Sequence, residues 1–349
     1  MRADGSEQTQ RTSFGDVGYV AWSPRGGGLA FGRPNQIRVM DRAGRGQRLV
    51  ARTQYTEQLY EDTYRLLALR PRALPSIRLV PSFTWLPDGR RLAFASPHQV
   101  CLVDITSREV TTLTHLRTGW CDEVCCSPDG SRVAFVHVDT VPPAWEALSI
   151  AHLPSGETSG VRDGLWPAIG ERRIVSLSFS PDGHWLAYSN VPHTVFDGSL
   201  TIRAWRPGVA RPRGAPSVPC FPEQWALPHD PTTTGSCERG YYFPVWAPSG
   251  DRLAARYDDW EQGYTSGVAV WDVATRKWSY WPGVGADYAT DLSFSPDGGQ
   301  LAFTHWPGAP GDRETPEIHV VDLRTGRRQK IADNAEMPCS RPNQEVVKP

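Results

Sequence analysis

The sequence predicts an all-β fold, specifically a six-bladed β-propeller with four antiparallel strands in each blade. One motif of the form S-P-D-G-x-x-L-A-F recurs six times along the chain. Alternating apolar residues flank each copy, and a further alternating run that ends in Asp follows most copies. Repeats of this kind are typical of propellers, in which each repeat forms one small sheet.

The six motif copies each predict a strand, a tight turn and a second strand. Pro fixes the φ angle of the turn, and Asp-Gly is expected to supply the left-handed positions that a hairpin needs. Two copies depart from the motif, with Arg25 or Ser249 in place of the turn Asp. The copies span Trp22 to Phe31, Trp85 to Phe94, Cys126 to Phe135, Phe179 to Tyr188, Trp246 to Ala255 and Phe294 to Phe303.

Two more strands are expected after most motif copies. Third strands end at an Asp, as at Asp41, Asp104, Asp272 and Asp322. Short turns then lead to fourth strands, such as Gln47 to Ala51, Val110 to Thr114 and Gln329 to Ala332. Four antiparallel strands in succession make a propeller blade.

The repeated S-P-D-G-x-x-L-A-F followed by a V-x-D strand resembles the TolB-like (WD40-like, PD40) propeller repeat, over roughly residues 19–333. The resemblance implies a non-catalytic scaffold that binds a protein or peptide. It assigns no site residues, because the repeated positions are structural ones.

The repeats predict one domain over residues 18–333, preceded by an N-terminal extension (1–17) and followed by a C-terminal tail (334–349). Two long insertions are expected, at 52–82 and 206–241. Within the first, residues 55–69 contain no Gly or Pro and have apolar residues at helical spacing, which predicts a short helix between blades one and two.

Composition excludes several function classes. The formal net charge is −1 and no basic stripe is present, so nucleic-acid binding is not expected. The chain has no long apolar run, which argues against a membrane span and, with the polar N-terminus, favours a cytoplasmic protein. The seven cysteines are read as core thiols, since no metal-binding spacing is seen. We expect a monomer without a cofactor.

The expected long loops all belong to one face of the propeller. The turns inside the motifs and between third and fourth strands are short, whereas the other connections carry every long insertion. Long loops in compact folds are usually functional or disordered, so this face is the expected working face.

Aligned positions at the channel mouth on this face include candidate site residues. Three residues before the first-strand aromatic stand Glu123 and Asp291, and two residues after the second-strand aromatic stand His137 and His305. Asp139 lies beside His137. Carboxylate and imidazole together could act as acid and base or bind a divalent metal, although a plain polar rim remains the alternative.

The acidic and aromatic run Tyr257, Asp258, Asp259 and Trp260 is a candidate docking face, with a solvated loop as its alternative. Three functions stay open. The first is a scaffold for a protein or peptide, and the second is a small-molecule hydrolase or lyase that uses the channel-mouth residues with or without a divalent metal. The third is a sugar-binding propeller that uses Trp145, Trp260 and Trp306.

Overall fold

The computed structural model describes residues 17, 19–56, 81–116, 119–139, 145–153, 155, 158–161, 172–192, 199–204, 224–226, 239–259, 265–282, 288–307 and 315–333. Strands and turns make up this part of the chain, which confirms the all-β class. It shows no helical insertion. Of the helix expected over 55–69, only Tyr55 and Thr56 are described, and neither is helical. No helix in these ranges is long and apolar enough to cross a membrane.

The described residues form six four-stranded antiparallel sheets, one for each motif copy, and every sheet consists of four consecutive strands. The first three sheets contain β1 (Tyr19–Trp22), β2 (Gly28–Arg33), β3 (Gln36–Asp41) and β4 (Arg48–Arg52); β5 (Phe83–Trp85), β6 (Arg91–Ser96), β7 (Gln99–Asp104) and β8 (Val110–Thr112); and β9 (Trp120–Cys126), β10 (Arg132–Asp139), β11 (Trp145–His152) and β12 (Thr158–Val161).

The last three sheets follow the same order. They contain β13 (Arg172–Phe179), β14 (Trp185–Pro192), β15 (Ser199–Ala204) and β16 (Gln224–Ala226); β17 (Arg239–Trp246), β18 (Arg252–Asp259), β19 (Thr265–Asp272) and β20 (Lys277–Pro282); and β21 (Tyr288–Phe294), β22 (Gln300–Trp306), β23 (Glu317–Asp322) and β24 (Arg328–Asp333).

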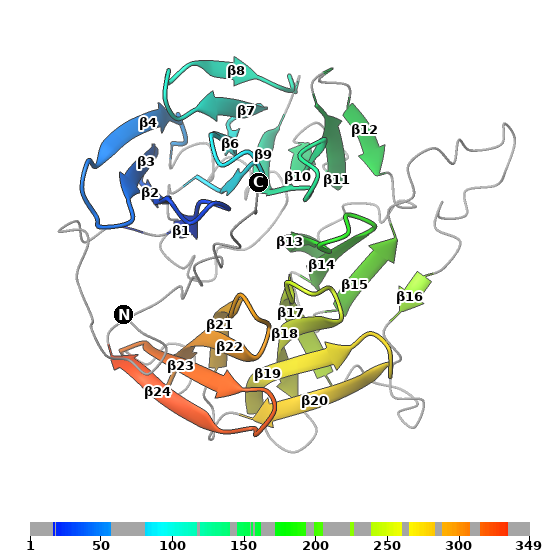
Figure 1. The fold of residues 1–349 in the computed structure, drawn as a ribbon. Coiled ribbons are helices and arrows are strands. Elements are labelled where there is room, and N and C mark those ends of the chain that lie inside the picture. Colours follow the sequence, from blue (N-terminus) through cyan, green and yellow to red (C-terminus); the bar gives the residue numbers. More distant parts are fainter. Residues whose placement is uncertain are drawn as a thin grey trace, which may run out of the picture.

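The sheets are arranged like blades around a common centre, with the first strand of each sheet innermost and the fourth toward the rim (Figure 1). Adjacent sheets meet mainly through their inner strands, as β5 and β6 do with β9, and β17 does with β21. The fold is a β-propeller. Among the described residues, each sheet consists of consecutive strands and includes none from the other end of the chain.

Apolar clusters between neighbouring sheets form the core. Phe83 and Phe94 pack with Ile37 between the first two sheets, and Phe294 and Phe303 pack with Val268 between the last two. Burying such side chains stabilises the fold by about 1.5–3 kcal/mol each. The motif's alternating apolar positions therefore serve as the contacts between blades.

Four described cysteines are free thiols within this core: Cys101, Cys121, Cys125 and Cys126. Burial raises the pKa of Cys125 to about 11 and that of Cys126 to about 12. Thiols with such pKa values stay protonated near neutral pH, so they are poor nucleophiles and poor metal ligands. The core-thiol interpretation is confirmed for these four residues, while Cys220, Cys237 and Cys339 lie outside the described residues.

The motif turn has one left-handed residue, its Gly, and not two as expected. Gly130 has a φ of 69° and donates its N–H to the carbonyl of Ser127 at 2.9 Å. Asp129 instead accepts hydrogen bonds from the side chain of Ser127 and from the backbone N–H of Ser131. These bonds lower the pKa of Asp129 to about 2, against the effect of partial burial.

Candidate functional site

The two ends of the sheets differ in how their polar groups are used. We call the end that carries the motif turns and the third-to-fourth strand turns the turn face, and the opposite end the connection face. On the turn face, Asp residues accept hydrogen bonds from the backbone of their own turns: Asp88, Asp104, Asp129, Asp182, Asp272, Asp297 and Asp322. Their carboxylates therefore already bind the backbone of their own turns.

The inner strands of sheets three to six share a β-bulge near the connection face. In each, a residue other than Gly at the same motif position has a positive φ, and the strand pairing shifts there. A bulge re-aims side chains and is common beside binding sites. The residues are Glu123 (31°), Ser176 (58°), Phe243 (54°) and Asp291 (52°). Two of the predicted channel-mouth residues are thus bulge residues.

The strand pairing gives the positions of the predicted carboxylate and histidine on each side. His137 pairs across the sheet with Cys121, while Glu123 is the bulge residue that the pairing skips. The side chain of Asp139 lies outside the described residues. In the last sheet, Asp291 accepts a hydrogen bond from Thr290 Oγ1 at 2.8 Å, and His305 pairs with Ala289. The sequence alignment found the positions but not their contacts.

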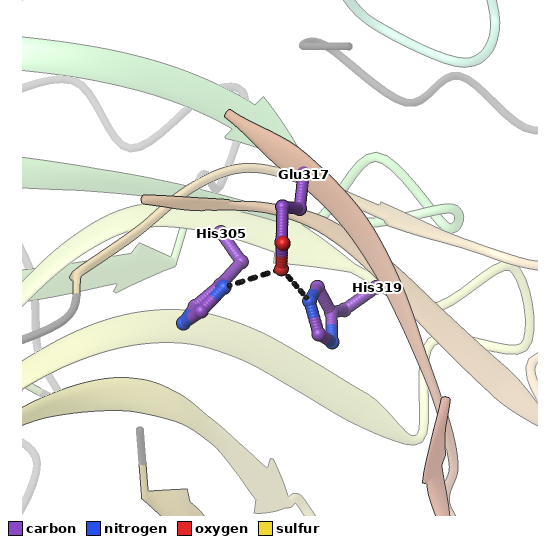
Figure 2. A group of neighbouring side chains, drawn as sticks. All are labelled: His305, Glu317 and His319. Atoms are coloured by element: carbon purple, nitrogen blue, oxygen red, sulfur yellow. Dashed lines mark hydrogen bonds and ion pairs between the residues drawn. The ribbon is translucent and has the colours of Figure 1, made fainter. Parts of the chain in front are cut away.

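His305 belongs instead to a cluster with two residues that the sequence analysis missed, Glu317 and His319. His305 lies directly opposite Glu317 in the pairing of β22 with β23, and His319 lies two residues further on the same face of β23. Their ligand-type atoms lie within 4.8 Å of one another. Figure 2 shows Glu317 between the two imidazole rings.

One oxygen of Glu317 binds both histidines. Oε2 lies 2.8 Å from Nε2 of His319 and 3.3 Å from Nδ1 of His305. The two rings meet edge to face, with centroids 4.6 Å apart. Both histidines are buried, at 7% and 9% exposure. The pattern Glu-x-His on a strand, with His on the adjacent strand, was the sequence signal for this cluster.

Cations from β24 complete the network. Lys330 Nζ donates to Oε1 of Glu317 at 3.0 Å, and Arg328 Nε donates to Nδ1 of His319 at 2.9 Å. Burial opposes ionisation of Glu317, but hydrogen bonds from His319, Lys330 and His305 outweigh it and lower its pKa to about 2. Burial, with the nearby charge of Arg328, lowers the pKa of His319 below its ordinary value.

The ligand types of this cluster, two imidazoles and one carboxylate, suit a divalent metal. The hydrogen bonds that these groups make, however, oppose metal binding. Since Nδ1 of neutral His319 accepts from Arg328, its proton must sit on Nε2, the atom that a metal between the three residues would need. Metal-bound histidines normally donate from their other nitrogen to an acceptor, whereas here that nitrogen faces a cation. Hydrogen bonds therefore link the three residues to one another and to β24.

The expected docking face is wrong for two of its four residues. Tyr257 and Asp258 are 5% and 2% exposed. Asp258 accepts two hydrogen bonds from Arg256, at 2.9 and 2.5 Å, which compensates the burial of its charge. They are therefore internal residues of β18. The side chain of Asp259 and the whole of Trp260 lie outside the described residues.

The tryptophans proposed for sugar binding give no exposed platform in the described part of the chain. Trp306 is half-buried, and its Nε1–H donates to Thr290 Oγ1 at 3.3 Å. The side chain of Trp145 and residue Trp260 are not described.

No protein-family model matches the chain, and no curated protein matches it. Solved structures do share its fold. A chain titled oligogalacturonate lyase in complex with manganese has a TM-score of 0.63 at 12% identity, covering 90% of this chain and 76% of its own. TolB from Acinetobacter baumannii has a TM-score of 0.54 at 14% identity, and the match covers 94% of this chain and 67% of TolB. A chain of a mitotic checkpoint complex has a TM-score of 0.56 at 14% identity, and the match covers 92% of this chain and 78% of that one.

Proposed function

We propose that the chain is a non-catalytic β-propeller that binds a protein or peptide partner through its connection face. The observation that carries this proposal is the contrast between the two faces. The turn-face carboxylates are bound within their own turns. The connection face instead holds an extended segment, residues 53–56, in a fixed position with polar side chains turned outward.

This anchored segment (residues 53–56) follows β4 and alternates buried and exposed residues. Asn35 holds Tyr55 from both sides, since Nδ2 donates to the Tyr55 carbonyl and Oδ1 accepts the Tyr55 N–H, each at 2.8 Å. Oδ1 also accepts from Thr53 Oγ1 at 2.9 Å. The buried Tyr55 hydroxyl donates to the Cys121 carbonyl on β9 at 2.8 Å. The segment therefore connects sheet one to sheet three.

Such rigidity suits recognition, because a surface that is already ordered loses less conformational entropy on binding. The propeller in the mitotic checkpoint complex is a structural neighbour that belongs to a protein assembly, which supports a binding role without identifying a partner.

A photo-crosslinking experiment tests the proposal. A photo-reactive amino acid replaces exposed Gln54 on the connection face or exposed Thr106 on the turn face of the full chain. After irradiation in the native cell lysate, we expect a discrete adduct from position 54 that unmodified protein competes away. The matched control at position 106 should give none. Adducts from position 106 alone, or from neither position, would contradict the proposal.

A metal-dependent lyase is the second candidate, because His305, Glu317 and His319 are ligand types that a divalent metal uses and because an oligogalacturonate lyase shares the fold, while the contact of Arg328 with His319 opposes metal binding. Incubation of the chain with oligogalacturonate and Mn²⁺ tests it directly. This candidate requires an unsaturated product that is lost in Glu317→Gln. If the wild-type chain yields no product, the lyase candidate fails.

A further inference from the structure

A polar hollow on the connection face lies between the first two sheets. Its volume is about 380 Å³, and it is lined by Arg52, Gln54, Thr56, Ser96, Pro97, His98 and Gln99. One wall is the end of β4 with the anchored segment, and the other is the turn that joins β6 to β7. The hollow therefore forms where two blades meet.

Buried and exposed residues alternate along the first wall, so its polar side chains lie on one side of the segment. Ala51, Thr53 and Tyr55 are buried, whereas Arg52, Gln54 and Thr56 are exposed. Because Asn35 and Cys121 bind Tyr55, the backbone that carries Arg52 and Gln54 is fixed. The wall is thus built before any ligand arrives.

Four of the lining side chains have no partner among the described residues. The side chains of Arg52, Gln54, His98 and Gln99 make no hydrogen bond or ion pair within the described part of the chain. Arg52 is the one permanent charge of the described lining, which contains no carboxylate. An unpaired guanidinium beside neutral hydrogen-bonding groups favours an anion.

Comparison of the first two sheets shows that His98 is placed unusually. The turns Arg33-Pro34-Asn35-Gln36 and Ser96-Pro97-His98-Gln99 are alike, and Asn35 and His98 both have positive φ, 55° and 64°. Their carbonyls also act alike, since Asn35 accepts from Thr53 N–H and His98 from Leu116 N–H. Only the side chains differ in use. Asn35 binds the anchored segment, whereas the His98 ring is left beside the hollow.

From this geometry we propose that the hollow binds a carboxylate of an acidic peptide segment, the docking group of the partner in the proposed function. The inference rests on that function and names the chemistry of the partner. Arg52 pairs with the carboxylate, and the amides of Gln54 and Gln99 and the ring of His98 offer further hydrogen bonds. One guanidinium matches the single charge of a carboxylate better than the double charge of a phosphate.

NMR titration of the isotopically labelled full chain tests the inference. The probe is N-acetyl-glutamate α-amide, and its neutral control is N-acetyl-glutamine α-amide, which has the same shape. We expect the glutamate probe to shift the Arg52 Nε–H and His98 ring signals saturably, and the glutamine control to leave them in place. Arg52→Gln should weaken binding by about tenfold, the loss of one charge-assisted contact.

Arg42→Gln is the matched control, because Arg42 is an exposed arginine of the same sheet on the turn face. It should bind the probe as the wild type does. Equal shifts with both probes, no saturable shift, or equal losses in the two variants would overturn the inference. If the titration fails but crosslinking from position 54 still gives the adduct, only the inferred carboxylate ligand is rejected. If crosslinking from position 54 gives no adduct, the proposed function itself is rejected.

Discussion

The Nε–H of Arg328 donates a hydrogen bond to Nδ1 of His319, with 2.9 Å between the two nitrogens. This contact decides the protonation of the ring, since it leaves the proton of neutral His319 on Nε2, which faces Glu317. A cluster with metal-type ligands is thereby held in a form that does not suit a metal.

Removal of Arg328 should consequently create a better metal site. In Arg328→Met, Nδ1 of His319 is free to carry the proton and Nε2 to bind a metal. We expect Zn²⁺ affinity, measured by isothermal titration calorimetry on untagged protein, to rise at least about tenfold over the wild type. The added substitution His319→Ala should cancel the gain. Equal affinities of wild type and Arg328→Met would show that Arg328 does not control the site.

Glu317 should make stability depend on pH. Its pKa in the folded protein is about 2, below the ordinary 4.5, so the folded state favours the ionised form. The resulting stabilisation, at most about 3 kcal/mol, is complete above pH 4.5 and decreases as pH falls toward 2. In urea unfolding, the difference in the free energy of unfolding between wild type and Glu317→Gln should therefore become smaller below pH 4.5. A difference that does not change with pH would contradict the lowered pKa of Glu317.

Asn35 and His98 form a matched pair for testing the anchored segment. Asn35→Ala removes three hydrogen bonds, to Tyr55 N–H, the Tyr55 carbonyl and Thr53 Oγ1. We expect a loss of about 2–4 kcal/mol in the free energy of unfolding. His98→Ala keeps the same left-handed turn but removes no such bond, so it should cost less than about 1 kcal/mol. Similar losses in the two variants would argue against the anchor.

The bulge position of the inner strands gives a test with two opposite signs. Ser176 has a φ of 58°, a conformation that favours Gly. Ser176→Gly should raise the free energy of unfolding by up to about 1 kcal/mol, and Ser176→Val should lower it by about 1–3 kcal/mol. Chemical denaturation of the three proteins measures both. Destabilisation by Gly as well as Val would mean that the backbone there is not left-handed.

The repeat architecture was predictable from the sequence because the motif determines both a local turn and the buried face of the strands that flank it. Each S-P-D-G sets a turn, and the flanking alternation sets a strand with a buried face. The turn geometry was only partly right. Asp129 was expected to be left-handed, but its carboxylate instead accepts the N–H of Ser131, which a residue with negative φ can do.

The site was less predictable, because contacts across strands depend on register. Alignment of the motif copies found His305 and Asp291, yet the bulge at Asp291 moves it out of the pairing, and Glu317 occupies the position opposite His305. Nothing in the residue types Glu123, Ser176, Phe243 and Asp291 indicates a shared left-handed conformation. Likewise, the sequence could not show that the charge of Asp258 is buried against Arg256.

The most direct test of the binding account is the dissociation constant of the crosslinked partner for two arginine variants of the full chain. Gln54→Arg adds a bulky charge to the connection face, and Thr106→Arg adds the same group to the turn face. The account predicts that Gln54→Arg changes the constant by at least about tenfold, whereas Thr106→Arg leaves it at the wild-type value. An unchanged constant for Gln54→Arg, together with a changed one for Thr106→Arg, would contradict it.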